Sequence, residues 1–371
     1  MNKIFEKGGK LYWLHSTVDA FETFLHVPGT VTLKGSHVRD AIDLKRLLIL
    51  VVIAAAPAAL FGMWNVGYQH GLAMGQTGVH ILEYFWFGFL TVLPLYLVSY
   101  IVGLGIEFAS SQIRGEEVSE GYLVSGFFIP LIVPVDIPLW MLAVAVAFAV
   151  IFGKEVFGGT GMNIWNPALL TRAFLFFSYP NYMSGSDCWI AFKKGETAVA
   201  DAFTGATPLA LDGPAQYGTG FWDLFIGTVP GSVGETSVIA ILLGAILLLW
   251  TGIASWKIMA GSVLGALLVG WIGNVAGITD IPFYMQLLYG GFAFGTVFMA
   301  TDPVTSCQTE CGKWIYGILI GMLCITVRLF NPGYAEGMML AILLLNTFAP
   351  LIDHCVTSVH ISRRAKKFNA A

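Results

Sequence analysis

The sequence is dominated by long apolar runs that contain almost no charged residues. Of its 371 residues, 56% are hydrophobic and only 11% are charged, whereas soluble domains carry about a quarter charged residues. Every backbone polar group inside a bilayer must bond within the protein, so only helices and closed barrels span it. Unbroken runs, rather than alternation with a period of two, predict helices. We therefore expect an all-α integral membrane protein with about ten transmembrane helices. The runs lie at residues 47–64, 81–103, 122–133, 138–152, 167–179, 238–253, 259–278, 287–300, 314–327 and 337–352.

The runs divide the chain into three parts. Residues 1–46 form a polar extension, residues 47–353 a membrane domain, and residues 354–371 a basic tail. Some runs are shorter than the roughly 20 residues that a helix needs to cross a bilayer. Their helices either extend into semi-polar flanks or are broken. The short runs are 122–133, 167–179 and 287–300.

The distribution of basic residues predicts the orientation. With the N-terminus in the cytoplasm, ten crossings leave all but four of the 19 basic residues on the cytoplasmic side, in line with the positive-inside rule. Lys193, Lys194 and Arg328 fall outside, and Arg172 lies within a run. The C-terminus then returns to the cytoplasm, and the polar interval 181–236 faces the opposite side of the membrane.

A weak internal repeat divides the membrane domain into two halves. Residues 164–169, IWNPAL, resemble residues 329–334, LFNPGY, and the short runs 122–133 and 287–300 hold matching places in each half. Five crossings per half would give the halves inverted topology, which in transporters places binding sites near the midplane between the repeats. Alternatively, Asn-Pro starts a helix in both places, because proline is favoured in the first turn. The sequence leaves both interpretations open.

Ionisable residues in or beside apolar runs are candidates for function, because charge is costly in lipid. Arg172 requires a partner inside the protein. Glu83, Glu107, Asp302 and Asp353 lie at the ends of runs, where an interfacial structural role is the alternative. We select Asp302 and Asp353 as candidates for an ion path.

Other signals give no catalytic or metal site. Residues 153–161, GKEVFGGTG, lack the Lys-Ser/Thr that follows the glycines of a phosphate loop, so they form a turn or line a cofactor. Five scattered cysteines and seven dispersed histidines give no metal-ligand spacing. No nucleic-acid-binding signature is present. We predict no catalytic side chain and no metal ligand.

One polar stretch, residues 201–207, DAFTGAT, has a more specific pattern. Its residues alone suggest a turn before Pro208. The pattern Asp-x-x-Ser/Thr-Gly-Ala-Thr, however, resembles the signal for covalent attachment of FMN to its last threonine. Further stretches resemble the family of B subunits of Na⁺-translocating NADH:quinone oxidoreductases, in register from about residue 20 to 365. They are PGTVT (28–32), HVRDAIDLKR (37–46), GKEVFGGTGMNIWNPALLTRAFLFF (153–177), GTVPGSVGE (227–235), GGFAFGTVFMATDPV (290–304) and NPGYAEGMMLAILL (331–344).

The resemblance implies a flavin site on the outer loop. Thr207 would carry FMN through a phosphoester, transferred from FAD by a separate flavin transferase. Asp201, Thr204, Gly205 and Ala206 would complete the attachment signal. The family also holds a non-covalent riboflavin and passes electrons to ubiquinone or menaquinone.

The resemblance further implies a quinone region, a fold and partners. By position, the quinone region includes Gly103, Glu107, Phe174 and Phe176. The fold would be like that of urea and ammonium channels, with two inverted five-helix halves. Five other subunits, A, C, D, E and F, would complete a Na⁺-exporting complex in the bacterial inner membrane.

Two other functions stay open. The D subunit of the related Rnf complex shares the threonine motif and the GGTG turn, although residues 28–46, PGTVTLKGSHVRDAIDLKR, favour the quinone reductase. A passive channel for a solute or ion, without flavin, would also suit an inverted repeat with short helices.

Overall fold

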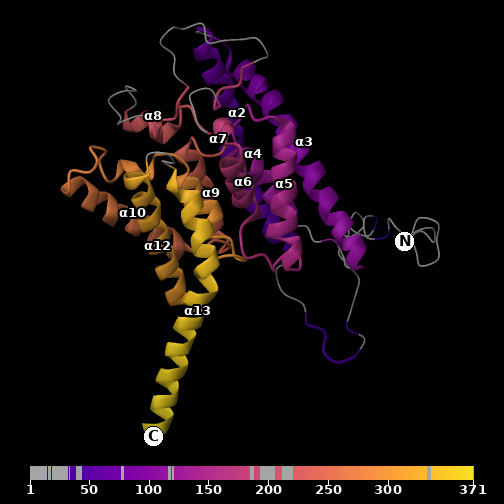
Figure 1. The fold of residues 1–371 in the computed structure, drawn as a ribbon, viewed down its shortest axis with the longest axis vertical. Helices are drawn as coiled ribbons and strands as arrows, with labels where there is room; N and C mark the ends of the chain where they lie inside the picture. Colours follow the sequence, from indigo (N-terminus) through magenta and orange to yellow (C-terminus); the bar gives the residue numbers. More distant parts are fainter. Residues whose placement is uncertain are drawn as a thin grey trace.

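The chain forms a bundle of helices (Figure 1). This computed structural model describes residues 15, 18, 32, 34–38, 44–76, 79–115, 118, 121–183, 188–192, 205–210, 220–331 and 336–370. Within these residues the regular structure is entirely helical, without strands, which confirms the all-α part of the predicted fold class. Helices α2 to α6 lie on one side in Figure 1, and α10, α12 and α13 lie on the other.

Most of the predicted runs coincide with single helices. Six helical stretches among the described residues are long and apolar enough to cross a membrane by length and composition: α2 (Leu44–Ala73), α3 (Ile81–Arg114), Leu139–Phe157, α10 (Trp256–Val275), α12 (Glu310–Phe330) and α13. The third comprises α5 (Leu139–Gly153) and the turn η2 (Glu155–Phe157), and α13 is Gly337–Ala370. The predicted tail from residue 354 thus continues α13 as one helix, seen projecting from the body in Figure 1.

Three apolar helices remain shorter than a bilayer. These are α4 (Tyr122–Ile132), α6 (Pro167–Ser178) and α9 (Val238–Trp250). Two short helices, α7 (Pro180–Met183) and α8 (Phe221–Ile226), lie between α6 and α9 in the sequence.

Helix α4 is interrupted rather than extended into its flanks. Val133 ends it with an extended backbone, φ −93° and ψ 156°, because a residue before proline, here Pro134, is pushed out of the helical region. The apolar side chains of the non-helical stretch that follows, Val133, Val135 and Ile137, are buried. Irregular backbone at this depth is therefore covered by protein, as lipid requires.

The run predicted at 287–300 is also interrupted. It consists of a 3₁₀ turn, η4 (Met285–Leu287), a single turn, α11 (Phe292–Phe294), and a π-helical turn, η5 (Gly295–Met299). The two interrupted segments meet in the core. The ring of Phe128 on α4 lies 5.8 Å from those of both Phe294 and Phe298, and all three are nearly inaccessible.

Helices α10 and α12 approach so closely that only glycine fits between them. A Cβ at Gly265 would lie 2.2 Å from the Ile318 carbonyl oxygen, and one at Gly321 would lie 2.0 Å from that of Ser262. Small residues allow this contact between membrane helices, where packing rather than the hydrophobic effect drives association.

We expect Gly321→Ala to destabilise the protein by about 1–3 kcal/mol, because the added methyl forces the two backbones apart. Thermal unfolding of the purified protein in detergent measures this as a lower midpoint. Gly105→Ala is the matched control, since a Cβ there on α3 meets nothing within 4 Å. Equal midpoints for the two variants would contradict the close contact.

Candidate functional site

The turn that carries Thr207 packs on the segment before α11. Gly205 and Ala206 are buried and Thr207 is half-buried. The Ala210 N–H donates to the Thr207 carbonyl oxygen over 2.9 Å, which closes the turn. Leu209 packs against a small apolar cluster of Leu224, Val229, Met285 and Tyr289. The predicted signal residues Asp201 and Thr204 lie outside the described residues.

Arg328, at the end of α12, fixes the segment on which this turn lies. Its Nη1 donates to the Gln286 carbonyl oxygen over 2.6 Å, and its Nη2 donates to that of Tyr289 over 2.8 Å. A Cβ at Gly290, where φ is +55°, would lie 3.0 Å from Leu209 and 3.5 Å from Arg328 Nη2. The Thr207 turn therefore lies beside a guanidinium group that is itself held by backbone carbonyls.

Arg172 has the internal partners that the sequence required. Its Nη1 lies 2.6 Å from Glu235 Oε1, and its Nη2 pairs with Glu336 Oε2. The Ser232 hydroxyl donates to Glu235 Oε2 over 2.5 Å. The network joins α6, the loop before α9 and the start of α13, and it confirms the expectation that Arg172 faces the protein interior.

A cavity of about 340 Å³ opens among the helix ends near Lys154. Its wall comes from the start of α2, α4, the turn after α5, the start of α6, the end of α9, and η5 with the loop after it. Most of the wall is apolar, and the polar residues in it include Lys154, Thr160, Asn163, Asn166 and Asp302. The volume lies in the range of roughly 300–1,000 Å³ typical of small-molecule sites, and an apolar wall with few polar groups is typical of them too.

Asp302 joins two walls of this cavity. Its Oδ2 accepts hydrogen bonds from Asn166 Nδ2 and the Thr305 hydroxyl, both over 3.2 Å, and its Oδ1 accepts one from the Val304 N–H over 3.1 Å. Burial raises the pKa of the Asp302 carboxyl, and these hydrogen bonds oppose the rise.

The side chain of Asn166 also caps α6. Its Oδ1 accepts from the Ala168 N–H over 3.0 Å, and Pro167 occupies the first turn. Asn166-Pro167 therefore starts a helix, which is the role that the sequence offered as the alternative to an internal repeat.

Gly103 and Glu107, two predicted quinone residues, lie together on α3. Glu107 is 3% exposed and its Oε1 accepts a hydrogen bond from Lys154 Nζ. A Cβ at Gly103 would lie 1.9 Å from the ring of Tyr122, so only glycine allows that ring to pack on α3. The Lys154 ammonium lies 5.9 Å from the centre of the same ring.

Phe174 and Phe176, the other two predicted quinone residues, are half-buried on α6. Phe174 stacks on Phe148 of α5 with 4.6 Å between ring centres, and Phe176 lies edge-on to Phe177 at 5.5 Å. Phe148 precedes Lys154 by six residues, or roughly 9 Å along a helix. Phe174 thus contacts α5 itself, whereas Glu107 contacts Lys154 in the turn after α5.

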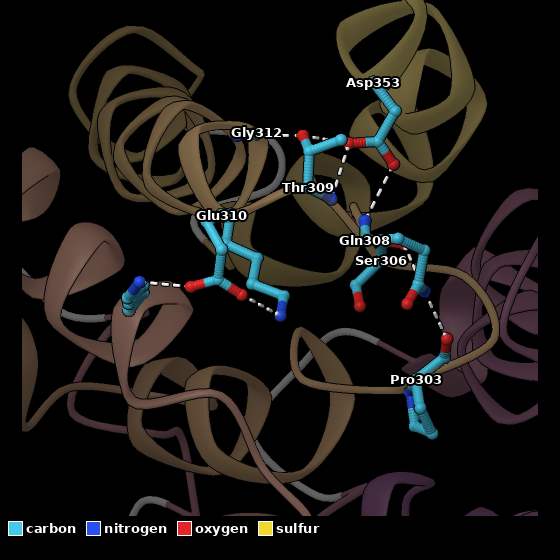
Figure 2. A network of polar contacts seen from close by, with 9 residues as sticks. Pro303, Ser306, Gln308, Thr309, Glu310, Gly312 and Asp353 are labelled. Carbon is cyan, nitrogen blue, oxygen red and sulfur yellow. Dashed lines mark hydrogen bonds and ion pairs between the residues drawn. The ribbon is translucent and has the colours of Figure 1, made fainter. Parts of the chain in front are cut away.

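Asp353, a predicted ion-path residue, holds the end of the loop between η5 and α12 (Figure 2). Its Oδ2 accepts from the Gln308 N–H over 2.7 Å, and its Oδ1 accepts from the Thr309 N–H over 3.0 Å and the Thr309 hydroxyl over 2.5 Å. The Thr309 Oγ1 in turn accepts from the Gly312 N–H over 3.1 Å and caps α12. These contacts tie α13 to the start of α12, and Asp353, unlike Asp302, does not line the cavity, which supports the structural alternative for Asp353.

Sequence reasoning did not single out Tyr122, Asn163 or Asn166 as site residues, and it considered Lys154 only as part of residues 153–161, a turn with a cofactor-lining role as the alternative. One signal for Lys154 was present: it is a cation that directly follows an apolar run and therefore needs a partner. Its partner, Glu107, lies 47 positions away, and no local pattern reveals that pairing.

We expect Arg172→Met to destabilise the protein by about 3–5 kcal/mol, because it removes the cation from two carboxylates whose side chains are only 10% and 16% exposed. The triple variant with Glu235→Gln and Glu336→Gln should recover a large part of this loss. Unfolding midpoints in detergent compare them. A triple variant no more stable than Arg172→Met would show that the charge network does not cause the effect.

Comparisons with known proteins cover almost the whole chain. The NQR2, RnfD, RnfE family matches residues 31–362. The chain is similar to the B subunit of the Na⁺-translocating NADH-quinone reductase of Ectopseudomonas mendocina (strain ymp), with 45% identity over 97% of this chain and 96% of that protein. The proteins of the same name from Stutzerimonas stutzeri (strain A1501) and Chromohalobacter salexigens are each 43% identical, over 97% and 98% of this chain and 96% and 94% of theirs.

Proposed function

The chain belongs to the NQR2, RnfD, RnfE family, and from this we propose that it is the flavin-carrying membrane subunit of a Na⁺-translocating NADH:quinone oxidoreductase. The observation that carries the proposal is identity of 43–45% over nearly the full length of proteins named as the B subunit of that enzyme. Those names imply other subunits, which we propose to be A, C, D, E and F. They also favour the quinone reductase over the Rnf D subunit, and co-purification with an NADH-oxidising partner distinguishes the two.

We propose that Thr207 holds FMN through its hydroxyl oxygen, attached by a separate flavin transferase. The proposal is supported by the position of Thr207, which is half-buried in a closed turn next to two small residues, Gly205 and Ala206. The contact of Leu209 with its apolar cluster fixes the turn, and Arg328 places positive charge nearby. FMN would supply reversible electron transfer, while the protein positions the ring and controls its surroundings.

We propose that the two halves are inverted repeats of five crossings each, as in urea and ammonium channels. Support comes from the matching interruptions at α4 and at residues 292–299, each in the third segment of its half, and from their contact through Phe128. Ten crossings place both termini in the cytoplasm of a bacterial inner membrane and the Thr207 turn on the opposite side.

We propose that the cavity at Lys154 holds the non-covalent riboflavin. Its volume of about 340 Å³ suits a three-ring heterocycle, and Asn163 and Asn166 supply amide groups of the kind that pair with the polar edge of such a ring. It lies where α6 begins and α9 ends, whereas the Thr207 turn lies in the connection between the end of α6 and the start of α9. The two flavins would therefore sit toward opposite faces, so electrons entering at FMN would cross much of the membrane before reaching quinone.

The quinone would bind near Gly103 and Glu107, whose partner Lys154 lines the cavity. Phe174 and Phe176 would contact a more distant part of the quinone. Asp302 remains the ion-path candidate of choice, because it lies half-buried in the cavity wall between the two halves. A passive channel is the second candidate, and it predicts ion flux through a chain without flavin.

We expect Thr207→Ala to abolish flavin fluorescence of the chain in denaturing gels, because no hydroxyl remains to carry the phosphoester. Thr228→Ala is the matched control, a half-buried threonine in the same interval between α6 and α9. The control should fluoresce like the unaltered protein. Fluorescence that persists in Thr207→Ala would refute the attachment.

We expect Ser125→Trp to fill the cavity and release the non-covalent flavin, because Ser125 on α4 lines it. Flavin freed by denaturing the purified complex should fall by about one equivalent, while gel fluorescence from Thr207 stays. Val144→Trp, on the exposed face of α5, should change neither value. An unchanged content of free flavin in Ser125→Trp would place riboflavin elsewhere.

A further inference from the structure

The wall of the cavity contains a buried ion pair. Lys154 lines the cavity, and its Nζ donates to Glu107 Oε1; each side chain is only 4% exposed. In the part of the chain that the structure describes, the second oxygen of Glu107, Oε2, has no hydrogen-bond partner. Such a pair is costly, because both charges leave water and their attraction often does not repay that loss.

Backbone hydrogen bonds fix the position of Lys154 in the cavity wall. The Lys154 N–H donates to the Val150 carbonyl oxygen over 3.2 Å and ends α5. The Lys154 carbonyl oxygen accepts from the N–H groups of Phe157 over 3.2 Å and Gly159 over 3.1 Å. The side chain lies between Glu107 and the ring of Tyr122.

The other charged groups of this region are already engaged. Glu155 pairs with Arg114 over 3.0 Å, and Asp302, on the facing wall, accepts hydrogen bonds from Asn166 and Thr305. Among the described residues that line the cavity, Lys154 is the one with a cationic side chain. Its partner Glu107 does not line the cavity.

A purely structural role would be to tie α3 to the turn after α5. Uncharged partners of similar size perform that role as well or better, since replacing a buried pair by well-packed neutral residues is often neutral or stabilising. A cationic residue in the cavity wall, whose counter-charge does not line the cavity, has an effect that neutral residues cannot have. It creates a positive potential inside the cavity.

We propose that Lys154 favours the reduced form of an isoalloxazine ring bound in this cavity, and that Glu107 limits the strength of that effect. The inference rests on the proposed function, which places riboflavin there. When the oxidised ring takes up two electrons and one proton, it gains one negative charge. Lys154 stabilises that charge. In the complex the electrons come from NADH.

The effect is measured as the ratio of affinities for reduced and oxidised riboflavin. A unit charge a few ångströms away in a partly buried site changes such a ratio by about tenfold or more. Lys154→Met should therefore lower the preference for the reduced ring by at least about tenfold. Glu107→Gln should raise it, because the ammonium then acts without its counter-charge. Lys154→Arg should stay close to the unaltered protein.

The experiment uses the full chain with Thr207→Ala in lipid nanodiscs, so that added riboflavin is the flavin being observed. Fluorescence quenching gives the dissociation constant of the oxidised ring, and titration with dithionite against a reference dye gives its reduction potential. The difference between the reduction potentials of bound and free riboflavin gives the affinity ratio. Lys257→Met is the matched control, because Lys257 also pairs with a glutamate, Glu310, but lies outside the cavity wall.

Opposite shifts for Lys154→Met and Glu107→Gln, with none for Lys257→Met, support the proposal. Shifts of the affinity ratio in the same direction for both variants, or no shift, overturn the proposal. The ion pair then serves only to tie α3 to the turn after α5. If Lys154→Met does not fold, the double variant Lys154→Gln with Glu107→Gln replaces it. The proposal predicts a lower affinity ratio for this double variant than for the unaltered protein, and an equal ratio overturns it. Absence of riboflavin binding by the unaltered cavity overturns the cavity assignment of the proposed function, whereas binding with an unchanged ratio overturns this proposal alone.

Discussion

Lipid cannot hydrogen-bond to the backbone, and this constraint governs the whole arrangement. Helix α4 ends at Ile132 and the segment around η5 is interrupted, so both must be enclosed by protein. The two segments pack on each other, because Phe128 contacts Phe294 and Phe298. The loop before α9 covers the end of α4, where the Gly234 N–H donates to the Leu131 carbonyl oxygen over 2.7 Å. The two halves of the chain are joined at this contact. Beside it a cavity opens toward one end of the bundle, and the Thr207 turn packs toward the other.

The buried charges lie around these interruptions. Arg172 draws together two carboxylates beside Gly291, where a Cβ would lie 2.4 Å from Glu235 Oε1. Lys154 and Glu107 form a pair beside the cavity, and Asp302 joins the start of α6 to the loop after η5. Ion pairs at these depths add little stability compared with apolar packing. They lie at the cavity wall and between the halves, where, under the function proposed above, protein groups would set the potential of a bound ring.

The sequence alone predicted much of the fold. Apolar runs located the helices, and the short runs marked α4 and η5 because interrupted helices contain too few residues to cross a bilayer. The single charge of Arg172 in an apolar segment predicted that this residue has a partner inside the protein, but not which residue that is. The pairing of Lys154 with Glu107, the hydrogen bonds of Asp353 to Thr309 and the contact of Leu209 with Tyr289 were not predictable. Each joins residues far apart in the sequence, and no local period or spacing encodes such a contact. The predicted quinone residues divide between α3 and α6 for the same reason, since position in a motif does not show that Glu107 pairs with Lys154 or that Phe174 stacks on Phe148.

The central claim is that a helical membrane protein carries a redox group on the hydroxyl of one threonine, at the opposite end of its bundle from a second, non-covalent flavin. Mass spectrometry of the peptide containing Thr207, released from native membranes, tests it most directly. The account predicts a mass increase equal to esterified FMN, with fragment ions that place it on Thr207. A peptide of unmodified mass from membranes with full NADH:quinone reductase activity would contradict it.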